Sequence, residues 1–212
     1  MTFKEFVRDK IVNSLLGFLD LRLVRKSNYI VGPYMVHLIH ACQVVDRRFT
    51  GPIHAIEIGT IRSRDEGTLS TLHMIRNLKP GSHVLSVDIS PEAIGISKEM
   101  CEKYSSNIDW ICSDGAQCLL TLENDSFELL LLDGSDDPEV TLKEFTIGFP
   151  KLRKGGICIV DNSGVKSDGS GTEYGHGGIK GHLIWRYCVE NHIGYEILRT
   201  QGINQLRVDK IV

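Results

Sequence analysis

The sequences FELLLLDG, residues 127–134, and GGICIVDNSG, residues 155–164, decide the fold of this chain. Each is a short apolar run that leads to an acidic residue, Asp133 in the first and Asp161 in the second. Such runs predict strands that are buried on both faces of a parallel sheet, and ligands of such sheets bind beyond the carboxyl ends of the strands. We therefore expect the chemistry of the protein at the ends of these two strands.

An alternating pattern of strands and helices surrounds these two runs. Strands are expected at 53–58, 83–88, 108–112, 127–133 and 157–161, with helices at 66–78, 91–104, 114–122 and 138–149. Successive β-α units of this kind predict an α/β fold with a Rossmann-like, doubly wound and mostly parallel sheet.

The last part of the chain has a different pattern. A polar, glycine-rich loop at 162–178 precedes a predicted helix at 179–191. Two further strands, 195–200 and 203–210, are joined by the short link Gln201-Gly202 and predict a hairpin. One of its strands should then run antiparallel to the rest of a seven-stranded sheet.

The first fifty residues are predicted to be helical. Residues 2–24 have apolar side chains at helical spacing, and a second helix is expected near 35–45, before Gly51 and Pro52. We interpret residues 1–50 as a helical appendage packed on a core domain of residues 51–212. Acidic residues disfavour a membrane-surface role for the first helix, whereas packing on the domain or pairing in a homo-oligomer fits it.

The composition excludes several classes of protein. The net charge is −3, from 27 acidic and 24 basic residues, and no long basic run indicates a nucleic-acid partner. The six cysteines form no C-x-x-C pair, which favours buried thiols in a reducing compartment over a zinc site. No apolar run approaches the roughly 20 residues of a membrane span, and the N-terminus lacks the plan of a signal peptide. We expect a cytoplasmic protein with a small-molecule substrate.

Oxygen-bearing side chains follow the two deciding strands. Asp133 follows the first strand, and Asp161 and Asn162 follow the second. Two carboxylates and an amide oxygen are ligands that Mg²⁺ or another divalent cation prefers, and three ligands leave positions open for substrate. The alternative, that the aspartates only cap the following turns, stays open.

Polar motifs also follow the first three strands. Glu57 to Thr60 read EIGT, and Gly67 follows where a helix is expected, which is typical either of a ligand site or of a tight turn. Asp88 ends the second strand in the position of a ribose-binding carboxylate, because Ser90 is available to cap the next helix. Asp114, within Ser113-Asp114-Gly115, fits helix capping and adenine recognition equally well.

In this order, EIGT, VDIS (87–90), SDG (113–115), LLLLDG (129–134) and LRKGGICIVDN (152–162) resemble the class I S-adenosylmethionine-dependent methyltransferases. The resemblance runs from about residue 53 to the C-terminus. It implies that the methionine part of the cofactor lies near Glu57, Gly59 and Thr60, the ribose at Asp88 and the adenine near Asp114. The complete implied set of cofactor contacts is Glu57, Gly59, Thr60, Gly67, Asp88, Ile89, Ser113, Asp114, Gly115 and Asp133.

Within this class, Asp133 followed by Asp161-Asn162 is similar to the divalent-metal site of the catechol and caffeoyl-coenzyme-A O-methyltransferases and of the macrocin and cephalosporin-tailoring enzymes. The resemblance implies a metal-assisted O-methyltransferase that acts on a small hydroxylated sugar, polyketide or phenolic. The cation would hold two substrate oxygens and direct one of them at the sulfonium methyl group.

The chain departs from this resemblance at two places. Six residues, IRSRDE, separate Thr60 from Gly67, and Arg62 or Arg64 is a candidate partner of the cofactor carboxylate. The catechol-type enzymes have a lysine base shortly after the first metal aspartate, where this chain has Ser135-Asp136-Asp137. Beside Asp133, a base is therefore expected from the loop after Asn162. His176 is the first candidate there. The other candidates are Lys166, Asp168, Glu173, Tyr174, Lys180 and His182.

Two other functions compete with this interpretation. A nicotinamide-dependent oxidoreductase could use a similar sheet, but the chain lacks G-x-G-x-x-G after its first strand. A non-catalytic, cofactor-binding partner subunit would give a role to the amphipathic helix at residues 2–24.

Overall fold

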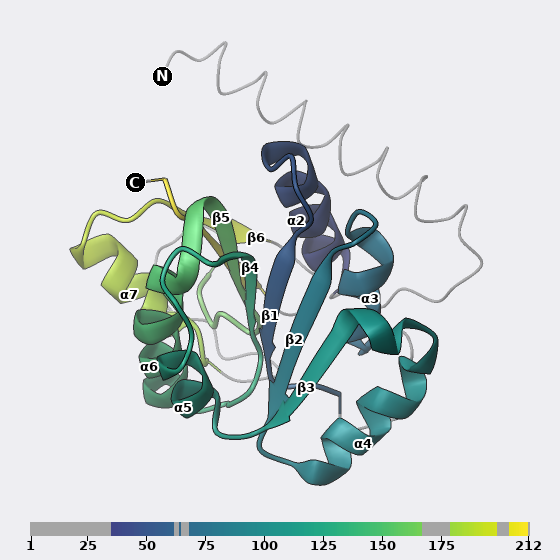
Figure 1. Cartoon of the computed structure of the whole chain (residues 1–212). Coiled ribbons are helices and arrows are strands. Elements are labelled where there is room, and N and C mark those ends of the chain that lie inside the picture. The colour runs from purple at the N-terminus through teal and green to yellow at the C-terminus, as the bar shows by residue number, and fades with distance from the viewer. Residues whose placement is uncertain (1–34, 62–63, 65–67, 167–178, 199–203, 212) are drawn as a thin grey trace. The chain divides into compact units, whose positions relative to one another are not determined.

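The computed structural model of the chain describes residues 35–61, 64, 68–166, 179–198 and 204–211 (Figure 1). The chain divides into two compact units, residues 1–31 and 32–212. All the elements below belong to the second unit. The expected helix at 2–24 lies outside the described residues.

Seven strands form one sheet in the order β3-β2-β1-β4-β5-β7-β6. Strands β1 to β5 are mutually parallel, and β7 pairs antiparallel with both β5 and β6. The expected doubly wound sheet with an antiparallel C-terminal pair is therefore confirmed. The strands are β1 (His54–Ile58), β2 (His83–Asp88), β3 (Ile108–Cys112), β4 (Phe127–Leu132), β5 (Leu152–Val160), β6 (Tyr195–Leu198) and β7 (Gln205–Asp209).

Helices cover both faces of this sheet. The helices α2, α3 and α4 lie on one face, and α5, α6 and α7 lie on the other (Figure 1). Their bounds are α2 (Met35–Arg48), α3 (Ser70–Asn77), α4 (Pro91–Met100), α5 (Gly115–Leu120), α6 (Pro138–Gly148) and α7 (His182–Glu190). None of the described helices has the length and apolar character needed to cross a membrane.

Polar side chains start three of these helices directly after the strands. The Ser90 hydroxyl accepts a hydrogen bond from the backbone N–H of Ala93, as expected, and Asp114 accepts one from Gln117 at 2.9 Å. Asp137 caps α6 in the same way. Because the caps satisfy N–H groups that a helix leaves open, they fix where each helix begins relative to the edge of the sheet.

The central strands are packed between the two helical layers. Leu130 and Leu132 of β4 and Phe145 of α6 have no exposed surface and belong to one apolar cluster. Burying such side chains contributes roughly 1.5–3 kcal/mol each. The packed sheet therefore fixes the positions of the strand ends from which the loops at its carboxyl edge extend.

Some expected boundaries were wrong. Strand β5 starts at Leu152, five residues before the expected start, because its first part contains polar residues and glycines and does not have the apolar pattern of a buried strand. The pairing of β5 with β4 is interrupted by a bulge, in which Gly155 has φ +88°. The helix expected at 91–104 ends at Met100, and a 3-10 helix (Glu102–Asn107) follows it.

Candidate active site

Two glycines join the ends of β1 and β4. Gly59 has φ +87°, and a Cβ atom on it would lie 2.4 Å from the Cα atom of Gly134. The Asp133 N–H donates to the carbonyl of Ile58 at 2.8 Å and continues the pairing of the strands to this point. Gly59 thus allows a neighbouring backbone to approach, and its expected contact with the cofactor stays a prediction.

A pocket opens at the carboxyl ends of β1, β2 and β3, beside this glycine contact. Six of the ten expected cofactor residues line it, namely Gly59, Asp88, Ile89, Ser113, Asp114 and Gly115. The other lining residues are Ile58, Val87, Gly134, Ser135, Val140 and Glu144. The chain thus has a crevice at the edge of the sheet where ligand binding was expected.

Asp88 is held at this pocket by backbone groups. Its two carboxylate oxygens accept hydrogen bonds from the N–H of Thr60 at 2.9 Å and from that of Ser90 at 2.7 Å. The residue is only 4% exposed. A carboxylate oxygen has more than one acceptor site, so both oxygens can still accept from a ligand hydroxyl. Asp88 therefore has the geometry expected of a ribose-binding residue.

Asp114 has the capping role that the sequence left open, and adenine recognition by its neighbourhood stays a prediction. Thr60 and Asp133 do not line the pocket. The Thr60 backbone holds Asp88, and its hydroxyl lies 3.2 Å from that of Thr71. Gly67 lies outside the described residues.

Glu57 is directed away from the pocket, into the layer between the sheet and α3. It has no exposed surface and accepts hydrogen bonds from the hydroxyls of Ser70, Thr71 and Ser86. Burial raises the pKa of Glu57, while the three hydroxyls oppose that shift. These contacts make Glu57 a fixed point between β1, β2 and α3, and its expected contact with the cofactor stays a prediction.

Glu144 is a pocket residue that the sequence analysis missed. It lies on the buried face of α6, is 3% exposed, and its Oε2 atom has no hydrogen-bond partner among the described residues. Burial and the nearby carboxylate of Asp114 raise its pKa to about 7, with Lys180 opposing the shift. In sequence, a glutamate among the apolar residues of a helix is indistinguishable from one that faces solvent. Only its low exposure in the structure identifies Glu144 as a pocket residue.

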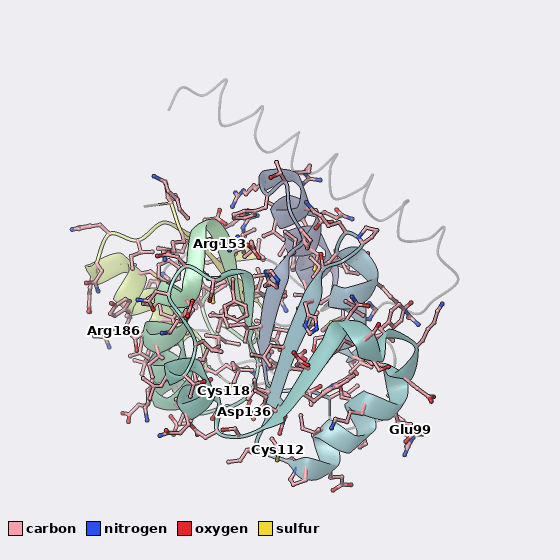
Figure 2. All side chains as sticks on the ribbon, viewed as in Figure 1. Glu99, Cys112, Cys118, Asp136, Arg153 and Arg186 are labelled. Carbon is pink, nitrogen blue, oxygen red and sulfur yellow. The ribbon has the colours of Figure 1, made fainter. Side chains whose placement is uncertain are left out.

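On the other side of the glycine contact, Lys180 lies between acidic side chains. Its ammonium group donates a hydrogen bond to Asp133 and lies 3.8 Å from a carboxylate oxygen of Asp136. The Lys180 side chain is 3% exposed, whereas Asp136 is 84% exposed. Figure 2 shows Asp136 at the edge of the sheet where the parallel strands end.

The charges of this cluster are interdependent. Burial lowers the pKa of Lys180, but Asp133, Asp161 and Asp136 raise it more, so the ammonium keeps its proton. Burial and Asp161 raise the pKa of Asp133, and Lys180 opposes both effects. Asp161 has a neutral partner as well, because the Gln205 side-chain amide donates to its Oδ1 atom at 2.6 Å.

Asp133 and Asp161, two of the expected metal ligands, are thus brought to one place, but they do not form an open metal site. The Oδ1 atom of Asn162 is buried and has no hydrogen-bond partner among the residues that the structure describes, as expected of an unoccupied ligand atom. However, the Lys180 ammonium already contacts the Asp133 carboxylate. An ammonium in contact with a carboxylate repels a divalent cation that would bind the same carboxylate. Within the described part of the chain, no three His, Cys, Asp or Glu side chains are grouped as metal ligands. The two carboxylates, Asp133 and Asp161, are therefore better suited to the ammonium group of Lys180 than to a metal ion.

The expected base His176 lies outside the described residues. So do Arg62, Asp168, Glu173 and Tyr174. Arg64 pairs with Glu99 on the surface.

Known proteins share both the family and the fold of this chain. A protein-family model described as a methyltransferase domain matches residues 56–163. No curated protein matches the chain. Of the solved structures, a protein from Corynebacterium glutamicum is 16% identical with a TM-score of 0.66, and the match covers 100% of this chain and 98% of that one.

Two similar structures are O-methyltransferases with bound ligands. The enzyme from Bacillus cereus, in complex with SAH, is 18% identical with a TM-score of 0.58, over 92% of this chain and 90% of that one. TomG from Streptomyces achromogenes, which is involved in tomaymycin synthesis and was determined in complex with SAM, is 14% identical with a TM-score of 0.58, over 81% and 78%. The family match spans half of the chain and confirms the resemblance drawn from the sequence. The chain therefore belongs to the methyltransferase domain family.

Proposed function

We propose that this protein transfers a methyl group from S-adenosylmethionine to a hydroxyl oxygen of a small molecule such as a sugar, a polyketide or a phenolic. The observation that carries the proposal is the carboxylate of Asp88, fixed by two backbone N–H groups at the edge of a crevice in a methyltransferase fold. A carboxylate in this position is suited to the paired hydroxyls of a ribose.

The rest of the crevice supports a nucleoside followed by a sulfonium group. From Asp88, the pocket extends past Ser113 and Gly115 on one side and reaches Gly134 on the other. A cofactor whose ribose is at Asp88 would have its adenine near Gly115 and its sulfonium toward the Gly59–Gly134 contact. The acceptor would then approach over Asp133, beyond Gly134.

The side chains beyond the glycine contact favour oxygen as the methyl acceptor. Asp133 is about one-third exposed and can accept a hydrogen bond from a substrate hydroxyl. The net charge of −3 and the absence of a basic run in the sequence favour a small acceptor over a nucleic acid. The two ligand-bound O-methyltransferases of the same fold agree with this choice.

The metal requirement that the sequence resemblance implied stays a prediction. Chelator treatment tests it directly, because activity that depends on Mg²⁺ or another divalent cation is lost with the metal and returns when the metal is added back.

Isothermal titration calorimetry with S-adenosylhomocysteine and with NAD tests the cofactor. We expect saturable binding of S-adenosylhomocysteine and none of NAD, and the reverse result would favour the oxidoreductase. A screen of hydroxylated metabolites with methyl-labelled S-adenosylmethionine then identifies the acceptor. If the purified chain binds the cofactor but methylates an acceptor only with a second protein present, it is the cofactor-binding partner subunit.

A further inference from the structure

The segment that carries Lys180 is held closely against the end of β5. A Cβ atom on Gly181 would lie 2.7 Å from the Cα of Ser163, and one on Gly164 would lie 2.6 Å from the Cα of Ile179. Neither glycine can be replaced without moving a backbone. The distance between the segment after β5 and the segment that carries Lys180 is therefore fixed. Lys180 is therefore placed beside Asp161 by the backbone as well as by its own ion pair.

This placement gives the cluster a cation of its own. Asp161 is close enough to Asp133 to raise the pKa of Asp133, and Lys180 interacts electrostatically with both carboxylates. The ammonium donates to Asp133, and the Gln205 amide donates to Asp161. The two carboxylates thus have partners without a metal ion, and the buried Lys180 ammonium has the carboxylate partner that a buried charge requires.

The charge balance with the proposed cofactor is also complete. Two carboxylates, one ammonium and one sulfonium give a net charge of zero, whereas an added divalent cation would bring it to +2. Asp136 adds little to this sum, because its side chain is 84% exposed and solvated. An excess positive charge beside the buried Lys180 ammonium is unfavourable, which makes the metal redundant.

We propose that Lys180 takes the place of the divalent cation in this protein, and that the Asp133–Lys180 pair orients the acceptor hydroxyl for a metal-independent methyl transfer. The proposal rests on the proposed function. The acceptor hydroxyl donates a hydrogen bond to the exposed part of Asp133, and Lys180 is a positioning residue that fixes this carboxylate. The hydroxyl proton passes to water, the oxygen forms the bond to the methyl carbon, and the electrons of the broken carbon–sulfur bond return to sulfur as S-adenosylhomocysteine leaves.

Binding of Mn²⁺ alone, followed by electron paramagnetic resonance, tests the proposal without any substrate. We expect the wild-type chain to show no saturable binding up to about 1 mM, which corresponds to a negligible affinity. Lys180→Met should bind one Mn²⁺ per chain, because Asp133, Asp161 and Asn162 lose the competing ammonium. One Mn²⁺ on the wild-type chain that is lost in Asp161→Asn would overturn the proposal.

Steady-state kinetics with an identified acceptor give the second test. Wild-type activity should be unchanged by chelator, and kcat of Lys180→Met should fall about 100-fold, as on removal of one preorganised donor. Lys180→Arg should retain more activity, because the charge remains. Lys143→Met removes an exposed lysine of α6 and is the matched control. Activity that is lost with chelator and restored by Mg²⁺ would also overturn the proposal.

Failure of this inference and failure of the proposed function are distinguishable. If calorimetry detects no S-adenosylhomocysteine binding, the proposed function fails, whatever the Mn²⁺ result. If the cofactor binds with an affinity within about threefold in wild type and Lys180→Met, differences in kcat report on the acceptor side. If Lys180→Met does not fold, the wild-type Mn²⁺ titration and chelator test still decide the matter.

Discussion

The two sides of the Gly59–Gly134 contact are built in different ways. One side is the pocket at Asp88, which we propose binds the nucleotide and call the nucleotide side; there, backbone N–H groups hold the Asp88 carboxylate, and behind it hydroxyl groups surround Glu57. The other side is the cluster of Asp133, Asp161 and Lys180, where we place the methyl acceptor and which we call the acceptor side; there, the main contacts join charged side chains, above all Lys180 and Asp133. Backbone contacts survive most substitutions, whereas a side-chain ion pair depends on two particular residues. The nucleotide side is thus suited to a constant cofactor and the acceptor side to a particular chemistry.

The largest expected effect comes from the contact that separates the two sides. Gly59→Ala places a Cβ atom 2.4 Å from the Gly134 Cα at a φ of +87°, and should destabilise the fold by about 4 kcal/mol. Urea denaturation measures the change. Gly95→Ala is the control, because a Cβ there meets nothing within 4 Å, and alanine in α4 should stabilise by about 0.5–1 kcal/mol. Equal stability of the two variants would show that the strand ends are free to separate.

A second substitution tests whether the backbone organises the nucleotide side. Asp88→Asn turns one acceptor into a donor that faces a backbone N–H, so the Thr60 or Ser90 N–H is left unpaired. Affinity for S-adenosylhomocysteine should fall about 100-fold, which corresponds to about 2.7 kcal/mol. Asp109→Asn, on β3 with a side chain 75% exposed, is the matched control and should bind as wild type does. Calorimetry of all three proteins decides the matter, and an unchanged affinity in Asp88→Asn would refute the ribose-binding role.

The third and smallest effect concerns Glu144, which borders both sides. Its pKa is raised from 4.5 to about 7, so the folded chain keeps this proton at a pH where the unfolded chain has lost it. Stability should therefore fall as pH rises from 4.5 to about 7, and Glu144→Gln should remove about 2 kcal/mol of that fall.

Chemical denaturation of the apoprotein at pH 5 and pH 8 measures this difference. Glu123→Gln changes an exposed glutamate and should leave the pH dependence as it is in wild type. The same pH dependence in Glu144→Gln and wild type would mean that Glu144 ionises normally and that water reaches the boundary between the two sides.

The same comparison explains how far the sequence could be interpreted. Strands β2 and β3 were predicted at their observed bounds, because each is a short run with apolar residues between polar turn residues. The place of Asp88 at the end of β2 was predicted for the same reason, since a strand end is a local feature, and its ribose-binding role stays a prediction. Lys180 was named only as one of several candidate bases. Its contact with Asp133 joins residues 47 positions apart, and nothing local in Ile179-Lys180-Gly181 specifies that partner.

The contacts of Asp161 have a consequence for the order in which the protein is assembled. Its partner Gln205 is the first residue of β7, and Lys180 precedes α7, whereas β1, β2 and β3 are complete by residue 112. Domains form from the N-terminal side while the chain emerges from the ribosome. The strands at which we place the nucleotide are thus available early in synthesis, whereas Asp133 acquires its cation only when Lys180 has been made, and Asp161 acquires its amide partner only with the last strand.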